Sequence, residues 1–126
     1  MGDEDVNAVL STLMTQYCRT IDAENYEGLA EIWWDDATLI VGDIRITGRD
    51  RIVRAIQRTH SQAGPGRHHF ANVRLVVEGD YASAHCDFLY FGPDRLLQQA
   101  GTYVDAFRRL SGEWRFISRE ILVDFS

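Results

Sequence analysis

The stretch RHHFANVRLVVEGDYASAHCDFLYF, residues 67–91, contains two strand-like runs joined by a tight turn. β-Branched and aromatic residues are frequent in both runs, and the Gly79-Asp80 turn between them is typical of a β-hairpin. Side chains alternate between the two faces of a strand. The adjacent His68 and His69 should therefore point to opposite faces of the sheet, one toward the interior and one away from it.

Alternation alone leaves open which histidine lies inside. The face that contains His69 is the more apolar, and its other members are Ala71, Val73, Leu75 and Val77. The face that contains His68 is mixed, with Phe70, Asn72, Arg74 and Val76. Strict alternation would bury His69, but a β-bulge within the strand would reverse the two faces beyond it.

The same strand pattern continues to the end of the chain. Residues 99–110 and 113–124 are two more strand-like runs, and a shorter hairpin is expected at residues 37–47 around Gly42-Asp43. Strands linked in sequence by short turns form antiparallel sheets.

Three helices are expected, two before the short hairpin and one between that hairpin and the strands that begin at residue 68. Apolar residues at the i, i+3, i+4, i+7 spacing predict the first helix, and short polar side chains can cap the first two. The three are residues 6–21 with Asp3 or Asp5 as cap, a short helix after Asn25 with Leu29, Ile32 and Trp33 on its apolar side, and residues 49–61 with Ile52, Val53 and Ile56 inward. Helices followed by hairpin-linked strands indicate the α+β class, with a curved antiparallel sheet around the long first helix and a pocket between them.

Composition limits the classes of function. The 126 residues suit one domain, residues 1–126, and the net charge of −6 argues against nucleic acid as a partner. No apolar run approaches the roughly 20 residues that span a membrane. The acidic start lacks the basic segment of a secretory signal, so we expect a cytoplasmic protein. Cys18 and Cys86 lie far apart without metal-ligand spacing, so we expect no metal and no disulfide.

Several polar residues are candidates for a site. Asp22 ends the first helix, where the helix dipole disfavours a carboxylate, so it is either a solvated turn residue or a group that orients a base. Tyr17 belongs to the apolar stripe of that helix, and its hydroxyl could reach the pocket. Arg119, in the last strand, would ordinarily be a solvated cation. No nucleotide-binding, metal-binding or nucleophile motif is present, so we expect no cofactor.

Three segments together resemble a known family. They are YCRTIDAENYEGLAEIWWDDATL followed by GR, then residues 67–91, then SGEWRFISRE. This pattern resembles the SnoaL-like family of the nuclear-transport-factor-2-like (cystatin-like) fold, in the branch with scytalone dehydratase, lindane dehydrochlorinase and bile acid 7α-dehydratase. The resemblance implies a cone-shaped curved sheet wrapped around three N-terminal helices, and it implies a homo-oligomer, a trimer before a dimer.

The resemblance also implies a site. The family pairs an aspartate at the end of the first helix, here Asp22, with a histidine four residues before an asparagine, here His68 before Asn72. It thereby favours His68 over His69. It further implies pocket roles for three other residues, which are Tyr17, Asp87 and Arg119.

The implied function is a cofactor-independent lyase, a dehydratase or dehydrohalogenase acting on a small, mostly apolar cyclic compound. In that reaction the histidine–aspartate pair is the general base. Two alternatives remain open. One is an isomerase or cyclase with Asp22 as the direct base, and the other is a non-catalytic protein, either a ligand-binding module or one resembling the small subunit of ring-hydroxylating dioxygenases.

Overall fold

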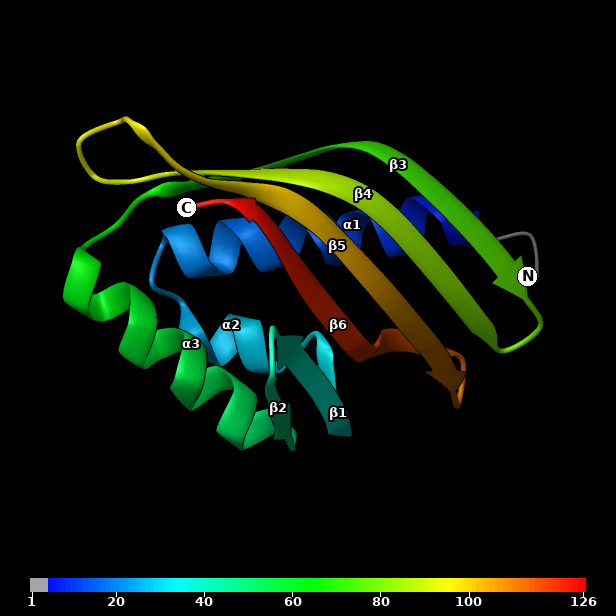
Figure 1. Cartoon of the computed structure of the whole chain (residues 1–126). Coiled ribbons are helices and arrows are strands. Elements are labelled where there is room, and N and C mark those ends of the chain that lie inside the picture. Colours follow the sequence, from blue (N-terminus) through cyan, green and yellow to red (C-terminus); the bar gives the residue numbers. More distant parts are fainter. Residues whose placement is uncertain (1–4) are drawn as a thin grey trace.

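A computed structural model describes residues 5–126 as three helices and a six-stranded sheet (Figure 1). The α+β class and the curved, open sheet are confirmed. The elements are α1 (Val6–Asp22), α2 (Tyr26–Ala30), β1 (Trp33–Val41), β2 (Ile44–Thr47), α3 (Arg49–Ala63), β3 (Arg67–Glu78), β4 (Tyr81–Phe91), β5 (Leu97–Leu110) and β6 (Glu113–Phe125).

The strands follow the order β2-β1-β6-β5-β4-β3 across the sheet. Neighbouring strands are antiparallel except for β1 and β6, which run parallel, so the expected wholly antiparallel sheet is wrong at this one pair. The chain leaves β2 through α3 and enters the opposite edge at β3. The meander from β3 to β6 then returns to β1, and β6 arrives in the same direction as β1.

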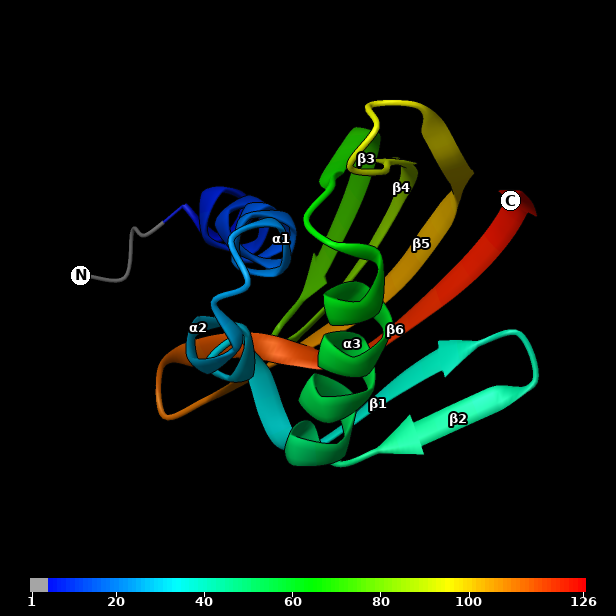
Figure 2. The ribbon, with the colours of Figure 1, turned by 90° about the vertical axis from the view of Figure 1, so that its left-hand side faces the viewer.

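The helices cover the concave side of the sheet. Figure 2 shows α1 end-on beside β3, and α3 crossing in front of the curled sheet. The C-terminal ends of α1 and α3, the start of β3 and the end of β6 all lie at one end of the molecule, at the left in Figure 1. The fold therefore gathers residues that are distant in sequence at this end.

The ends of α1 and α2 follow the expected capping residues. The Asp5 side chain accepts a hydrogen bond from the Ala8 N–H, and the Asn25 side chain accepts one from Gly28. Asp3, the other candidate cap, lies outside the described residues. From the sequence, Trp33 was expected on the apolar side of the second helix. In the structure it is instead the first residue of β1, and it is fully buried.

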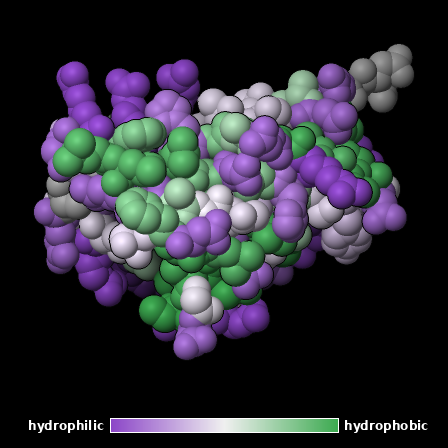
Figure 3. Space-filling model, turned by 45° about the horizontal axis from the view of Figure 1, so that its top comes forward, coloured by the Kyte–Doolittle hydropathy of each residue, from purple (hydrophilic) through white to green (hydrophobic). Residues whose placement is uncertain are grey.

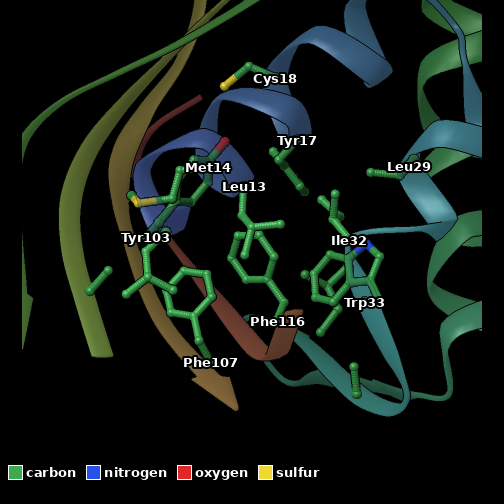
Figure 4. Close-up of a cluster of buried hydrophobic side chains, with 14 of the residues drawn as sticks. Leu13, Met14, Tyr17, Cys18, Leu29, Ile32, Trp33, Tyr103, Phe107 and Phe116 are labelled. Atoms are coloured by element: carbon green, nitrogen blue, oxygen red, sulfur yellow. The ribbon is translucent and has the colours of Figure 1, made fainter. Parts of the chain in front are cut away.

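One aromatic and aliphatic cluster holds α1 against the sheet (Figure 4). Leu13, Met14 and Tyr17 face inward from α1, as the helical spacing predicted, and they are buried. Across from them, the sheet contributes large buried side chains, which are Trp33, Tyr103, Phe107 and Phe116. This packing fixes the position of α1, and with it the positions of Tyr17 and Asp22.

Candidate active site

Asp22 and His68 form a hydrogen-bonded pair at the end of the molecule where α1 ends and β3 begins. Asp22 Oδ1 lies 2.7 Å from His68 Nδ1, and Asp22 Oδ2 accepts the His68 backbone N–H at 2.9 Å. The side chains are only 6% exposed for His68 and 18% exposed for Asp22. Because an ionised carboxylate can only accept hydrogen bonds, Nδ1 carries the proton of the neutral ring, and Nε2 keeps a free lone pair. The two donors also offset the unfavourable position of Asp22 at a helix C-terminus.

A β-bulge in β3 explains why His68, and not His69, lies inside. The pairing of β3 with β4 shifts between Ala71 and Arg74, and Asn72 within the shift has φ of 58°. Asparagine tolerates this left-handed conformation better than most residues. His68 is therefore turned inward before the bulge and Leu75 after it, while His69 is exposed. The assignment of His69 to the buried face by strict alternation is wrong for this reason.

His68 lines a partly open cavity of about 260 Å³ between α1, α3 and the sheet. The cavity is mostly aromatic, and ring centroids lie 4.6 Å apart for His68 and Tyr90 and 6.1 Å apart for His68 and Tyr17. Other residues that line it are His60, Phe88, Gln98, Gln99 and Tyr103. A cavity of this kind, apolar with a few polar groups, suits a small organic ligand.

A second hollow, of about 660 Å³, lies on the outside between α1 and β3 and reaches the same pair from the other side. Its lining includes Asp22 and His68, but also the exposed side chains of Arg19, Arg67 and His69. Exposed arginines leave this hollow wet. The smaller cavity has a more aromatic lining without arginine, and it is therefore the better place for a reaction that removes a proton from carbon.

Tyr17 lines the cavity of about 260 Å³, as expected from its place in the apolar stripe of α1. It is 3% exposed, and burial raises the pKa of its phenol to about 12. The phenol therefore keeps its proton at neutral pH. Tyr17 can serve as a hydrogen-bond donor in the cavity.

Arg119 is buried rather than solvated, and it forms a bidentate ion pair with Asp105. Its Nε and Nη2 lie 2.7 and 2.8 Å from the two carboxylate oxygens, and neither residue is more than 2% exposed. Burial alone would lower the pKa of Arg119, but the Asp105 carboxylate raises that pKa above its ordinary value.

The guanidinium of Arg119 supports two tyrosines of the cavity. It lies 3.7 Å from the ring centroid of Tyr103 and 4.2 Å from that of Tyr17. Ala106 of β5 pairs with Ser118, but the next residue, Phe107, pairs with Phe116, so β6 has one extra residue at this point. Because of this extra residue, Phe116 and Arg119 both point inward. Arg119 is thus placed behind the cavity wall rather than within its lining.

Asp87 is not brought into the site. It alternates along β4 with the buried Cys86 and Phe88, so it lies on the exposed outer face. There its carboxylate accepts a hydrogen bond from Asn72 Nδ2 at 2.7 Å. The expectation that Asp87 faces the pocket fails because of this alternation, and its contact stabilises the bulge in β3 instead.

The sequence reasoning missed two residues of the site region. Asp105 carries no sequence signal apart from its position between the inward Tyr103 and Phe107. His60 follows Ile52 and Ile56 at steps of four, and this helical spacing could have placed it on the inward side of α3. Burial, and then the neighbouring His68, lower the pKa of His60 to about 4.

Neither a metal cluster nor a membrane-spanning helix is found in residues 5–126. No group of three or more potential ligand side chains gathers there, and no helix there is both long and apolar enough to cross a bilayer.

Comparisons with known proteins define the class. The architecture matches solved structures of the NTF2-like, or cystatin-like, fold. The SnoaL-like domain model matches residues 4–120, and the chain therefore belongs to the SnoaL-like domain family, as the sequence resemblance indicated. No curated protein matches the sequence.

Three solved structures illustrate the likeness. The hexachlorocyclohexane dehydrochlorinase LinA-type3 from Novosphingobium barchaimii is 23% identical, with a TM-score of 0.84 over 95% of this chain and 87% of that one. A proposed scytalone dehydratase from Novosphingobium aromaticivorans is 20% identical, with a TM-score of 0.78 over 92% and 82%. ActVI-ORFA from Streptomyces coelicolor is 18% identical, with a TM-score of 0.80 over 94% and 97%. At these identities the likeness establishes the fold.

Proposed function

We propose that this protein is a cofactor-independent lyase that eliminates water or hydrogen halide from a small cyclic compound. The observation that carries the proposal is the Asp22–His68 pair, with its 2.7 Å contact at Nδ1 and its place beside an aromatic cavity. Among the structural neighbours, a dehydrochlorinase and a proposed dehydratase agree with this class of reaction.

The chemistry follows from the free nitrogen of His68. Nε2 takes a proton from a substrate carbon, and Asp22 stabilises the imidazolium that forms. The electron pair of the broken C–H bond forms a carbon–carbon double bond, and the bond to the leaving group breaks. A chloride leaves as the anion, whereas a hydroxide takes the proton from His68 and leaves as water. The Tyr17 hydroxyl can donate a hydrogen bond to the oxygen or halogen as charge develops.

In this scheme Arg119 is a positioning residue. Its guanidinium is bound to Asp105 and covered by the rings of Tyr17 and Tyr103. It therefore acts on the substrate through the two tyrosines. This differs from the direct pocket role that the family resemblance implied.

The geometry disfavours Asp22 as a direct base, the role it would have in an isomerase. Both carboxylate oxygens accept hydrogen bonds from His68, which lowers their basicity, and Asp22 does not line the cavity of about 260 Å³ as His68 does. A purely ligand-binding protein would need no such pair. Burying charged and polar groups costs free energy unless they are fully hydrogen-bonded.

An assay in D₂O separates these functions. We expect cyclic β-hydroxy ketones or chlorinated cyclohexanes to lose water or chloride and to gain a double bond, as followed by NMR. An isomerase would instead exchange deuterium into the substrate and keep the leaving group. Exchange without elimination across the whole panel, or no reaction with any member, would contradict the lyase assignment.

We also propose that the chain forms a homo-oligomer, a trimer before a dimer, through the outer face of the sheet. Figure 3 shows hydrophobic patches on that side of the molecule. Exposed apolar residues there include Val76, Tyr81, Leu89 and Leu122, each at least 40% exposed. Apolar surface of this kind is usually covered by a partner.

Light scattering at micromolar concentration checks the assembly. We expect about three times the mass of one chain, and Leu89→Lys should reduce it because a charge would be buried in the contact. A wild-type protein that is monomeric at this concentration would overturn the proposal.

A further inference from the structure

The outer hollow of about 660 Å³ between α1 and β3 has no part in the proposed elimination. Figure 2 shows α1 end-on beside β3, which is an edge strand, so no strand of residues 5–126 pairs with this side of it. Asp22 and His68 both line the hollow, whereas only His68 also lines the smaller cavity. The volume of the hollow is in the range of sites for small organic molecules.

Two arginines from different elements meet at this hollow. Arg19 lies in the last turn of α1 and Arg67 is the first residue of β3, and both side chains are exposed. The arginines that form ion pairs within residues 5–126 are others, such as Arg108 and Arg109, so these two guanidinium groups have no carboxylate partner there. Guanidinium groups bind carboxylates and phosphates through two parallel N–H donors.

The free edge of β3 adds a backbone donor. The His68 N–H points away from β4, because it donates to the carboxylate of Asp22. His68 and Phe70 pair with Tyr90 and Phe88 with no register shift between them, and N–H groups two residues apart on an antiparallel strand point the same way. The Phe70 N–H therefore points to the same free edge, where it has no acceptor among residues 5–126, and Phe70 lines the hollow.

The charges of the lining favour an anion. Arg19 and Arg67 contribute two positive charges. Asp22 contributes one negative charge, and both of its oxygens already accept hydrogen bonds from His68. The whole chain has a net charge of −6, so this local excess of positive charge runs against the balance of the molecule.

We propose that the hollow is a second binding site, for a small organic molecule that carries a carboxylate or phosphate group. Arg19 and Arg67 bind the oxyanion from the helix side and the strand side, and the Phe70 N–H donates a further hydrogen bond to it. The hollow is much larger than an inorganic ion, and Cys18 and Ala23 contact the organic part of the ligand. The site is independent of the proposed elimination, because this anion lies behind the base and outside the cavity.

Benzoate and benzamide test the need for charge, because they have nearly the same shape and only benzoate is an anion. An NMR titration of the backbone amides at about 0.1 M salt gives the affinity from the Phe70 signal. We expect benzoate to bind at least about tenfold more tightly than benzamide. Arg19→Gln and Arg67→Gln should each weaken benzoate binding about threefold to tenfold, since each removes one charged pair of donors.

Arg74→Gln is the matched control. It removes the same charge from the same strand, but Arg74 is exposed beyond the bulge and lines a different hollow with Val76, Ser83 and His85. At about 0.1 M salt, ions screen exposed charges over about 10 Å, so this variant should change benzoate affinity by less than about twofold. Circular dichroism shows that each variant is folded.

Several results would overturn the proposal. They are equal binding of the two probes, binding of neither, unchanged benzoate affinity in Arg19→Gln or in Arg67→Gln, an equal loss in Arg74→Gln, and a Phe70 amide signal that does not respond to benzoate. A Phe70 signal that responds to inorganic phosphate and not to benzoate would mean an adventitious ion only, and it would also overturn the proposal. Failure of the lyase assay would leave this site standing, because the probes are not substrates.

Discussion

His68→Ala should lower turnover at least about a hundredfold on any compound that the wild-type protein eliminates, because general-base catalysis is typically worth about 10² to 10⁴ in rate. The alanine variant has no group that can take the proton from carbon. Asp22→Asn should lose a similar amount, since the carboxylate fixes the Nδ1–H tautomer and stabilises the imidazolium. Steady-state kinetics with the compounds of the D₂O assay measure both losses.

His69→Ala serves as the control for this prediction. Its ring lies outside, with its centroid 5.7 Å from that of Phe91, so its removal should change turnover only slightly. The account would be wrong if His69→Ala were inactive while His68→Ala kept full activity. Circular dichroism should show that all three variants retain the fold.

Asp105→Asn should lower the free energy of unfolding by about 3–5 kcal/mol, because it leaves the buried Arg119 guanidinium without its counter-charge. The pair is almost completely inaccessible, so water cannot replace the lost carboxylate. Natural domains are stable by only about 5–15 kcal/mol, and the variant should therefore be close to unfolding. Urea denaturation followed by circular dichroism gives the difference.

An exposed ion pair provides the matched control. Asp36 binds Arg108 at 3.0 Å, but its side chain is 59% exposed. Asp36→Asn should cost no more than about 1 kcal/mol, since water screens such pairs. The account of Arg119 fails if the two aspartate variants unfold at the same urea concentration.

Much of the fold could be predicted from the sequence, because periodic patterns mark most of its elements. The helical stripe of α1, the Asn25 cap and the runs that form β3 to β6 were all predicted within a few residues. The parallel pairing of β1 with β6 was not, because strand order depends on long-range contacts that no local pattern encodes. The place of Trp33 at the start of β1 was also not predicted, because a tryptophan suits the end of a helix and the start of a strand equally well.

The site was predictable only in part, and two strand irregularities are the reason. Tyr17 followed from helical spacing, whereas the choice of His68 came from family resemblance and opposed the strand pattern. The bulge at Asn72 reverses the faces of β3, and the register shift in β6 turns Arg119 inward. Each feature depends on one residue of extra chain length in one strand, which period-two reasoning cannot detect.

The double variant Asp22→Asn/His68→Ala tests the central claim most directly, because the claim is that the two residues work as one base. Groups that act as a unit show strongly non-additive losses. Turnover of the double variant should lie within about threefold of the slower single variant. If instead the two losses multiply, Asp22 and His68 act independently, and the histidine–aspartate base is not the machinery of this site.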